Sequence, residues 1–459
     1  MTKPLVHATC LVLSFTVLLA CTKHNPVSTT APNTPPLSSV KEIDSFTVYN
    51  AADEPFSPSA IFVTDLPGDT ILVSLPPNVY LNDLIPVFTF KGKSVYPVSG
   101  TVVNLSTPVY FTVNAEDGSQ INYTVIVTTR GAVYFGTSDG RMLMLDAGTG
   151  NQIWMDSLGG GFQYSIPQLL GSNIYTASTS GMLYGLDYVA GVVKWQFQAG
   201  GPVATTPTMA GGFVYFGCND DNFYVVDLSL WSLYWQFPTG GPVQSQPLAV
   251  GDTAYFASGD GNLYKVNAYS RSATWQFNLS GPVGSASPQI NKGTVYIGSR
   301  SDSLYAVDAV TGMLKWSAKA DGLSLENSTP TLADSTVYIG AESGSLFAFN
   351  DSTGGVRWKS LPGVSVSDQP FVYNNSVYVT AGDGNLYAVD AGSGVKKWSV
   401  AGLYANGSGP IVANGVLYVG GGGSGYFYAI DPANGNVKWK FSTGSATSLS
   451  YRPLYIPGY

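Results

Sequence analysis

The sequence predicts an all-β protein in which an eight-bladed β-propeller follows a small β-sandwich. Three observations predict this fold. Short apolar or alternating runs, separated by Gly, Pro, Asn and Asp, occupy most of the chain, as strands and turns do. From residue 131 onward a Tyr in an apolar run and a Trp each recur at a spacing of 40 to 42 residues. A fixed period of about 40 residues, with several short strands per unit, is typical of propeller blades.

The composition agrees with a turn-rich β-protein and excludes one class of partner. The 459 residues are enough for more than one domain. Only 11% of them are charged, whereas Gly reaches 53 and Tyr 29. The formal net charge is −8, and nucleic-acid binding needs a basic surface, so we expect no nucleic-acid partner.

Residues 1–20 are predicted to be an export signal rather than part of the fold. Lys3 gives a positive start, and residues 11–20 form an apolar run that is too short for a permanent transmembrane helix. The run ends in Leu-Leu-Ala-Cys, with Cys21 last, which resembles the lipobox of bacterial lipoproteins. The resemblance implies cleavage before Cys21, acylation of that residue and membrane attachment through a lipid anchor. The alternative is an unmodified Cys of the signal region, like Cys10.

The residue after the lipobox bears on localisation. Thr22 follows Cys21, so the Asp that retains some lipoproteins at the inner membrane is absent. We therefore expect a lipid-anchored protein of the outer membrane, in either the periplasmic or the cell-surface leaflet.

Cysteine and histidine usage limits the chemistry of the folded part. Cys218 is the only Cys beyond the anchor, so no intramolecular disulfide is expected there. The two His residues, His7 and His24, lie in the signal and just after the anchor. This excludes His-based catalytic triads and His metal sites in the predicted domains. We predict no catalytic residue, no metal site and no cofactor.

A tether and the sandwich precede the repeats. Residues 21–42, rich in Pro, Ser and Thr, are predicted to be a flexible tether. Residues 43–129 contain five strand-like runs separated by turn residues, which predicts a β-sandwich. The end of this segment, PVYFTVNAEDGSQINYTVIVTT, resembles immunoglobulin-like modules near the N-terminus of many Bacteroidetes surface lipoproteins. We find no ligand constellation in this segment, so a spacer role is expected.

Each repeat in residues 130–459 is predicted to contain four strands. The first strand is expected to carry a Pro: Pro167, Pro207, Pro247, Pro288, Pro330, Pro370, Pro410 and Pro453. The second carries the Tyr: Tyr134, Tyr175, Tyr215, Tyr255, Tyr296, Tyr338, Tyr378 and Tyr418. The third ends in Asp or Asn: Asp146, Asp187, Asp227, Asn267, Asp308, Asn350, Asp390 and Asp431. The fourth ends near a docking Trp: Trp154, Trp195, Trp235, Trp275, Trp316, Trp358, Trp398 and Trp439.

The offset of the repeat predicts how the ring closes. The first Tyr strand has no Pro strand before it in the propeller, and the last Pro strand, at Pro453, has no Tyr strand after it. We therefore expect the C-terminus to supply the innermost strand of the first blade, which leaves no open edge between the two ends of the ring.

The repeat resembles that of PQQ-type propellers. AVDAVTGMLKW (306–316), AVDAGSGVKKW (388–398) and AIDPANGNVKW (429–439) are similar to the tryptophan-docking motif of that family, which includes quinone-dependent dehydrogenases and BamB-like lipoproteins of outer-membrane protein assembly. The second to fourth repeats depart from the motif because they lose its Thr-Gly turn. The motif is structural: the turn Asp accepts backbone N–H bonds, and the Trp packs one blade on the next.

Three functions are compatible with this resemblance. A non-enzymatic scaffold that binds a protein partner needs only an anchored ring, and we favour it. Binding of a surface glycan or other ligand would suit the tether and spacer. A quinone-dependent dehydrogenase is the third reading, disfavoured because the chain lacks adjacent cysteines and its short repeats leave no room for large insertions.

Two sets of residues are candidate binding sites. The turns between second and third strands open on one face and carry seven acids and two arginines, Arg141 and Arg300, a formal charge of −5. The acids are Asp139, Asp220, Asp221, Asp260, Asp302, Glu342 and Asp383. We hypothesise that this acidic rim docks a partner or a divalent ion, although tight turns favour such residues in any case. On the opposite face, Trp231 and Tyr269 are a candidate aromatic contact, with packing against a neighbouring blade as the equal alternative for Trp231.

Overall fold

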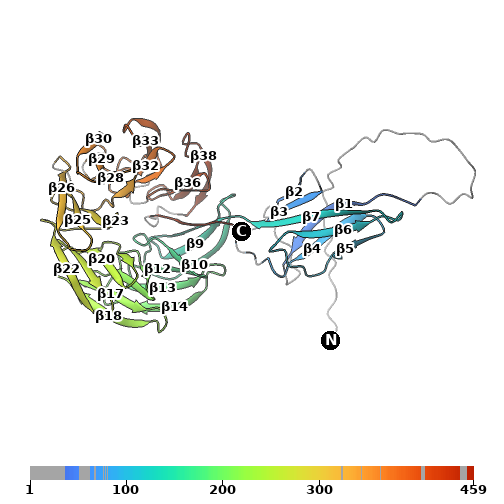
Figure 1. Ribbon diagram of the computed structural model, residues 1–459, viewed down its shortest axis with the longest axis horizontal. Coiled ribbons are helices and arrows are strands. Elements are labelled where there is room, and N and C mark those ends of the chain that lie inside the picture. The colour runs from blue at the N-terminus through green and yellow to red at the C-terminus, as the bar shows by residue number, and fades with distance from the viewer. Residues whose placement is uncertain are drawn as a thin grey trace, which may run out of the picture.

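The computed structural model describes residues 37–50, 62–66, 69–75, 77, 79, 81–321, 324–342, 344–361, 363–404, 409–444 and 452–458. The regular elements of this part of the chain are all β-strands (Figure 1), which confirms the predicted fold class. It contains no helix long and apolar enough to cross a membrane. The predicted signal, Cys21 and most of the predicted tether lie outside the described residues.

The N-terminal unit is a sandwich of two sheets (Figure 1). One sheet pairs β1 (Glu42–Tyr49) with β4 (Ile85–Lys91). The other has five strands in the order β2 (Phe62–Leu66), β3 (Thr70–Leu75), β7 (Gln120–Thr129), β6 (Val109–Asn114) and β5 (Ser94–Tyr96). Strands β3 and β7 are parallel, and the other pairs are antiparallel. The alternating apolar side chains of both sheets meet in one core, where Phe46 and Phe88 pack edge-on against Phe111.

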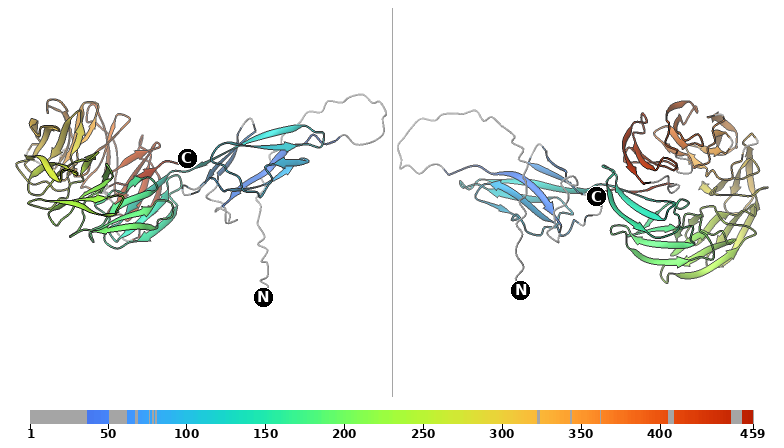
Figure 2. Two further views of the ribbon diagram at one scale, coloured as in Figure 1. Left: turned by 60° about the horizontal axis from the view of Figure 1, so that its bottom comes forward. Right: turned by 180° about the vertical axis from the view of Figure 1, so that it is seen from behind.

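The C-terminal unit is a ring of blades (Figure 2), and the described residues form eight four-stranded sheets. The innermost strands are short: β39 (Leu454–Ile456), β11 (Gln168–Leu170), β15 (Thr208–Ala210), β19 (Leu248–Val250), β23 (Gln289–Asn291), β27 (Thr331–Ala333), β31 (Phe371–Tyr373) and β35 (Ile411–Ala413). We number the blades one to eight in this order.

The second and third strands form the buried centre of each blade. The second strands are β8 (Ala132–Gly136), β12 (Asn173–Ala177), β16 (Phe213–Gly217), β20 (Thr253–Ala257), β24 (Thr294–Gly298), β28 (Thr336–Ala341), β32 (Ser376–Thr380) and β36 (Val416–Gly421). The third strands are β9 (Arg141–Asp146), β13 (Met182–Asp187), β17 (Asn222–Asp227), β21 (Asn262–Asn267), β25 (Ser303–Asp308), β29 (Ser345–Asn350), β33 (Leu386–Asp390) and β37 (Tyr426–Ile430). Most of their side chains are buried because each blade is covered on both faces by its neighbours.

The fourth strands lie at the outer edge of the ring. They are β10 (Gln152–Ser157), β14 (Val193–Gln198), β18 (Ser232–Pro238), β22 (Ser272–Asn278), β26 (Leu314–Lys319), β30 (Val356–Ser360), β34 (Lys396–Val400) and β38 (Val437–Ser442).

The recurring prolines lie outside the innermost strands, which corrects the prediction that those strands carry them. Pro167 directly precedes β11, and Pro453 directly precedes β39; the other six inner strands start in the same way. A Pro has no N–H to donate to a ladder, so it is confined to strand starts and edges. The prolines therefore mark where each inner strand begins.

The C-terminus closes the ring, as the repeat offset predicts. Strand β39 pairs antiparallel with β8, and the register places Tyr455 opposite Val133. The neighbouring blade eight completes the closure: Phe427 stacks on Phe135 at 4.4 Å, and the indole of Trp439 donates to the Ala147 carbonyl at 3.1 Å.

The recurring Tyr and Trp act together, which explains why both repeat. In blades one and four to eight, the Tyr hydroxyl and the Trp Nε1 donate to one and the same carbonyl oxygen of the following blade. In blade five, Tyr296 and Trp316 both donate to Asp351, at 3.0 Å each. A carbonyl oxygen has two lone pairs and can accept both bonds. The predicted docking role of these tryptophans is thus a shared hydrogen bond as well as packing.

One arginine joins the sandwich to the propeller. Strand β7 ends at Thr129, and the next residue, Arg130, donates its N–H to the Leu75 carbonyl of the sandwich at 2.9 Å. The guanidinium of Arg130 forms a buried ion pair with Asp146 of blade one at 2.6 Å.

Candidate functional site

The acidic rim lies around one mouth of the central channel. The turns between second and third strands bond to the connections between blades: Asn219 N–H to Pro202 at 3.0 Å, Gly259 N–H to Pro242 at 2.8 Å and Glu342 N–H to Ser324 at 3.0 Å. Asn219 and Glu342 also line the channel mouth. The turns, the connections and the mouth therefore share one face of the ring.

Three of the rim acids lie in hairpin turns with the same local sequence pattern, Asp-x-Asn-x-Tyr. Asp220, Asp260 and Asp383 each accept a hydrogen bond from the Tyr four residues later, at 2.5, 2.8 and 2.5 Å. Each also accepts the backbone N–H two residues later, which closes the turn. Burial, and next the bond to the carboxylate, raises the pKa of the partner Tyr264 to about 12. These acids thus serve their turns, as the alternative interpretation had it.

The remaining rim acids differ in whether a cation neutralises them. Asp139 pairs with Arg141 at 2.7 Å, and the hydrogen bond from that guanidinium is the main reason its pKa is lowered. Asp302 pairs with Lys319 at 3.7 Å, and Glu342 accepts a hydrogen bond from Asn327. Among the described residues, five rim acids have no ion-pair partner: Asp220, Asp221, Asp260, Glu342 and Asp383. The rim therefore keeps a negative charge after local pairing.

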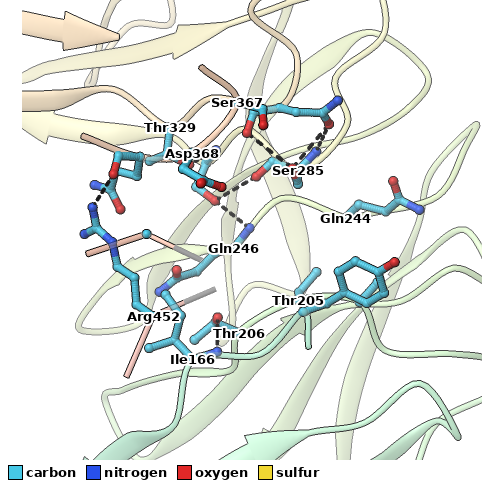
Figure 3. A pocket seen from close by; sticks show the side chains of 16 residues that line it. Ile166, Thr205, Thr206, Gln244, Gln246, Ser285, Thr329, Ser367, Asp368 and Arg452 are labelled. Atoms are coloured by element: carbon cyan, nitrogen blue, oxygen red, sulfur yellow. Dashed lines mark hydrogen bonds between the residues drawn. The ribbon is translucent and has the colours of Figure 1, made fainter. Parts of the chain in front are cut away.

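The channel mouth is a polar cavity of about 410 Å³. Its described lining combines carboxamides, hydroxyls and carboxylates with one aromatic ring: Tyr164, Ala204, Asn219, Gln244, Ser285, Asn327, Glu342, Ser367 and Asp368. Toward the recurring prolines the channel continues as a space of about 50 Å³. Figure 3 shows the side chains that line it. There, residues directly before the recurring prolines point inward, and neighbouring blades bond through them: Ile166 N–H to Thr206 at 2.8 Å and Gln246 N–H to Ser287 at 2.8 Å.

Arg452 crosses the channel at the level of this smaller space (Figure 3). It precedes β39 in blade one, yet its guanidinium donates to the carbonyls of Gln369 and Pro370 in blade seven, at 2.6 and 3.0 Å. The intervening blade eight has Gly409 at this position, which leaves room for the crossing. Burial lowers the pKa of Arg452 to about 10, and the charge of Asp368 opposes that shift. These two hydrogen bonds to carbonyl oxygens tie blade one to blade seven across the channel.

Trp231 is half-buried and packs on the neighbouring blade, which favours the packing alternative for this residue. It occupies the position of the motif Gly, with a φ of +52°, and stacks on the docking Trp195 at 4.2 Å. Because Trp231 fills that space, the Nε1 of Trp195 is buried and has no hydrogen-bond partner among the described residues. Tyr269 remains 63% exposed and contacts Phe213 only edge-on, at 5.4 Å.

The described residues contain no group of three or more His, Cys, Asp or Glu side chains placed to hold a metal ion. Cys218 is buried as a free thiol, and burial raises its pKa to about 12. It contacts backbone carbonyls of the neighbouring loop, Gly201 and Pro202.

Comparison with protein-family models shows to which family the ring is similar. Residues 138–267 and 227–441 match a family model described as outer membrane protein assembly factor BamB, and these two overlapping segments span well over half of the chain. The chain belongs to the BamB family. Residues 59–127 match a second model, described as SGBP, N-terminal, so this BamB-family chain carries an additional N-terminal domain.

Solved structures agree on the fold of the BamB-like ring. BamB from Moraxella catarrhalis is 21% identical, with a TM-score of 0.55, over 62% of this chain and 89% of that one. The computationally designed Ika8 protein is 12% identical, with a TM-score of 0.52, over 63% of this chain and 90% of that one. A comparison with curated proteins finds no match.

The sequence analysis missed the channel. The residue before each recurring Pro was available as a signal, since in six of the eight repeats it is Thr, Ser, Gln or Arg rather than an apolar residue of a buried strand, the exceptions being Ile166 and Gly409. Its inward direction, and the meeting of Arg452 with Asp368, 84 positions apart in the chain, depend on the closed ring.

Proposed function

We propose that this BamB-family chain is a non-enzymatic, lipid-anchored scaffold of the outer membrane, which docks a basic patch of a protein partner on its acidic rim. The observation that carries the proposal is the set of five rim acids without an ion-pair partner in the described part of the chain, arranged around the open channel mouth. The family match supports a role in protein assembly, because the matched family model is described as an outer membrane protein assembly factor.

The charge of the rim favours long-range attraction of a basic partner over the formation of tight ion pairs with it. The carboxylates of Asp220, Asp260 and Asp383 already accept turn hydrogen bonds, but those bonds do not cancel their charge. A ring of like charges creates a potential that raises the association rate of a complementary patch, and salt screens it.

The test neutralises four rim acids together, as Asp220→Asn, Asp221→Asn, Asp260→Asn and Asp383→Asn. Detergent-solubilised outer membranes are passed over the immobilised variant at 50 and 300 mM NaCl, and captured proteins are compared with those held by the unmodified chain. We expect the variant to lose the salt-sensitive part of the capture. Capture that keeps both its strength and its salt dependence would rule out the rim as the docking face.

A matched control removes the same charge from the opposite face. The turn acids Asp187, Asp227, Asp308 and Asp390 can become Asn, because Asn267 and Asn350 already occupy this position in blades four and six. This variant should keep the salt-sensitive capture. Equal losses in both variants would indicate an effect of net charge rather than of the rim.

The anchor is tested separately through Cys21, on the basis of the lipobox. Cys21→Ser should move the protein from the membrane to the soluble fraction of the cell envelope, because acylation then has no acceptor thiol. Tight membrane association of this variant would contradict the lipid anchor.

A further inference from the structure

The channel mouth is built largely from one position of the repeat. Six of its lining residues come from successive connections between blades and lie three positions before a recurring Pro: Tyr164, Ala204, Gln244, Ser285, Asn327 and Ser367. The same position in the other two repeats lies outside the described residues. Figure 3 shows Gln244, Ser285 and Ser367 on separate connections around the space. Each of these connections therefore contributes one side chain to the mouth.

Hydrogen bonds between neighbouring loops orient the polar side chains of the mouth. Gln244 donates its Nε2 to the Oδ1 of Asn219 at 3.1 Å. The Oδ1 of Asn327 accepts from the N–H and the hydroxyl of Ser285, at 3.0 and 3.2 Å, and its Nδ2 donates to Glu342. These two sets of bonds fix carboxamides and a carboxylate over the arc from blade three to blade six.

The same bonds leave acceptor oxygens at the cavity. Within the described residues, the Oε1 of Gln244 and the Oε2 of Glu342 have no hydrogen-bond partner. The described lining of the mouth includes two carboxylates, Glu342 and Asp368, and neither Lys nor Arg. Arg452 lies in the smaller space beyond, where its guanidinium donates to two carbonyl oxygens. The mouth therefore suits a ligand that has several N–H donors and a positive charge.

The opposite side of the mouth is less polar. Tyr164, which is 40% exposed, lies between blades one and two, and Asn327 lies between blades five and six. In a ring of eight blades these two connections face each other across the axis. Tyr164 and the neighbouring Ala204 thus offer a surface for an alkyl stem whose charged head reaches Glu342. The cavity of about 410 Å³ is of the size usual for ligand sites.

We propose that the channel mouth receives the guanidinium group of an arginine side chain of the protein partner. A guanidinium has five N–H donors in one plane and a permanent charge, which match a carboxylate with amide oxygens near it. Its stem packs on the ring of Tyr164. The inference rests on the proposed function, which brings a basic partner to the rim, and adds which side chain enters the channel and where it binds.

The experiment titrates the full chain, purified in detergent, with the tripeptide acetyl-Gly-Arg-Gly-amide in 50 mM NaCl, followed by ligand-detected NMR. The control peptides carry Lys or citrulline, the uncharged isostere of Arg, in the central position. We expect the Arg peptide to bind at least about threefold more tightly than the Lys peptide, because only Arg can bond to several acceptors in one plane. The citrulline peptide should not bind detectably.

Two variants of the mouth and one of the rim locate the binding. Glu342→Gln and Gln244→Leu should each weaken binding of the Arg peptide by about three- to tenfold, since each alters one acceptor. Asp383→Asn removes the same charge as Glu342→Gln from a rim acid that is not among the lining residues, and should change the affinity by less than about twofold. Both mouth side chains are only half-buried, so the melting temperatures should stay close to that of the unmodified chain.

The outcomes decide the inference separately from the proposed function. Failure of the Arg peptide to bind, equal binding of the Lys or the citrulline peptide, or an unchanged affinity of both mouth variants would overturn it. The titration needs no partner, whereas the rim is tested by salt-sensitive capture from membranes. If the rim variant loses this capture while the Arg peptide does not bind, the proposed function stands and the arginine site is refuted. Peptide binding together with unchanged capture would refute the docking rim instead.

Discussion

Six of the blade interfaces and the two that flank blade three are held together differently. In the six, Tyr and Trp share a carbonyl acceptor across the interface, and a Gly of the facing turn lies beneath the indole. In the two others, Trp231 and Arg271 occupy the Gly position. There, Trp231 stacks on Trp195, and the guanidinium of Arg271 lies 4.5 Å from the ring centre of Tyr234.

This difference shows what the motif Gly does. Blade two, which the sequence analysis grouped with the departures, keeps Gly191, and Trp154 docks on it with the usual bond to Tyr188 at 3.3 Å. The Thr of the motif is therefore dispensable, whereas the Gly decides whether the indole reaches its acceptor. At the two interfaces that flank blade three, aromatic and cation–π contacts take the place of the hydrogen bonds that Tyr and Trp share elsewhere.

The largest expected effect comes from opening the ring at an interface of the regular kind. Truncation after Ser448 removes β39 and Arg452, so blade one loses its inner strand and the bonds to blade seven. We expect the free energy of unfolding to fall by several kcal/mol, a large part of typical domain stability. Thermal melting measures this, with truncation after Ile456 as the control. An unchanged melting temperature would refute closure through β39.

The next test converts a regular interface into the exceptional kind. A Cβ at Gly354 would lie 2.6 Å from the Trp316 ring, so Gly354→Trp should displace Trp316 from its bond to Asp351. We expect a loss of about 1–3 kcal/mol, measured by urea unfolding. Gly415→Trp is the control, because Gly415 also has a positive φ, of +69°, but faces open space. Equal losses would mean that the backbone, not the indole contact, sets the cost.

The reverse substitution should cost less. Trp231→Ala removes a stacked ring and leaves a non-Gly residue at positive φ, so we expect a loss of about 1–2 kcal/mol. Trp231→Gly relieves the backbone and lets Trp195 donate to the Leu228 carbonyl, so it should be the more stable of the two. The indole N–H resonance of Trp195 should shift downfield in the Gly variant alone. An unshifted resonance would show that the bond does not re-form.

The smallest expected effect distinguishes Asp from Asn at the end of the third strand. Hydrogen bonds from Thr311 lower the pKa of Asp308 to about 2. A carboxylate with a lowered pKa stabilises the fold above its unfolded value, and this contribution is lost as the pH falls from about 4 to 2. Asp308→Asn should therefore lower the melting temperature slightly at pH 7 and make no difference near pH 2. A constant difference at both pH values would contradict the linkage. In blade four, Asn267 already occupies this position.

Periodicity carried most of the fold prediction, and it failed where residues of different repeats meet. The spacing of Tyr and Trp predicted the repeated four-stranded sheets and the closing strand, because each blade solves the same packing problem. It could not show that Trp231 stacks on Trp195, since Trp231 lies outside the repeat pattern. The rim acids were predicted from turn chemistry alone, and the structure shows why for Asp220, Asp260 and Asp383: each of their bonds to the following Asn and Tyr stays within five residues of the chain.

In the sandwich, too, the pattern of apolar residues predicted part of the fold and left the strand register open. Alternation of apolar residues predicted β1, β3, β4, β6 and β7 but not β2 or β5, and β5 has only three residues and pairs with β6 in a register that the sequence does not reveal. The proximity of Tyr96 to Tyr110 follows from that register.

The crossing of Arg452 determines how wide the central channel is between the two faces of the ring. A ring with an open axis is a tube, and a solute could pass from one side to the other. Here the space at the level of Arg452 is about 50 Å³, room for little more than ordered water, beneath a mouth of about 410 Å³. Within the described part of the ring, Arg452 therefore constricts the channel at the level of the recurring prolines.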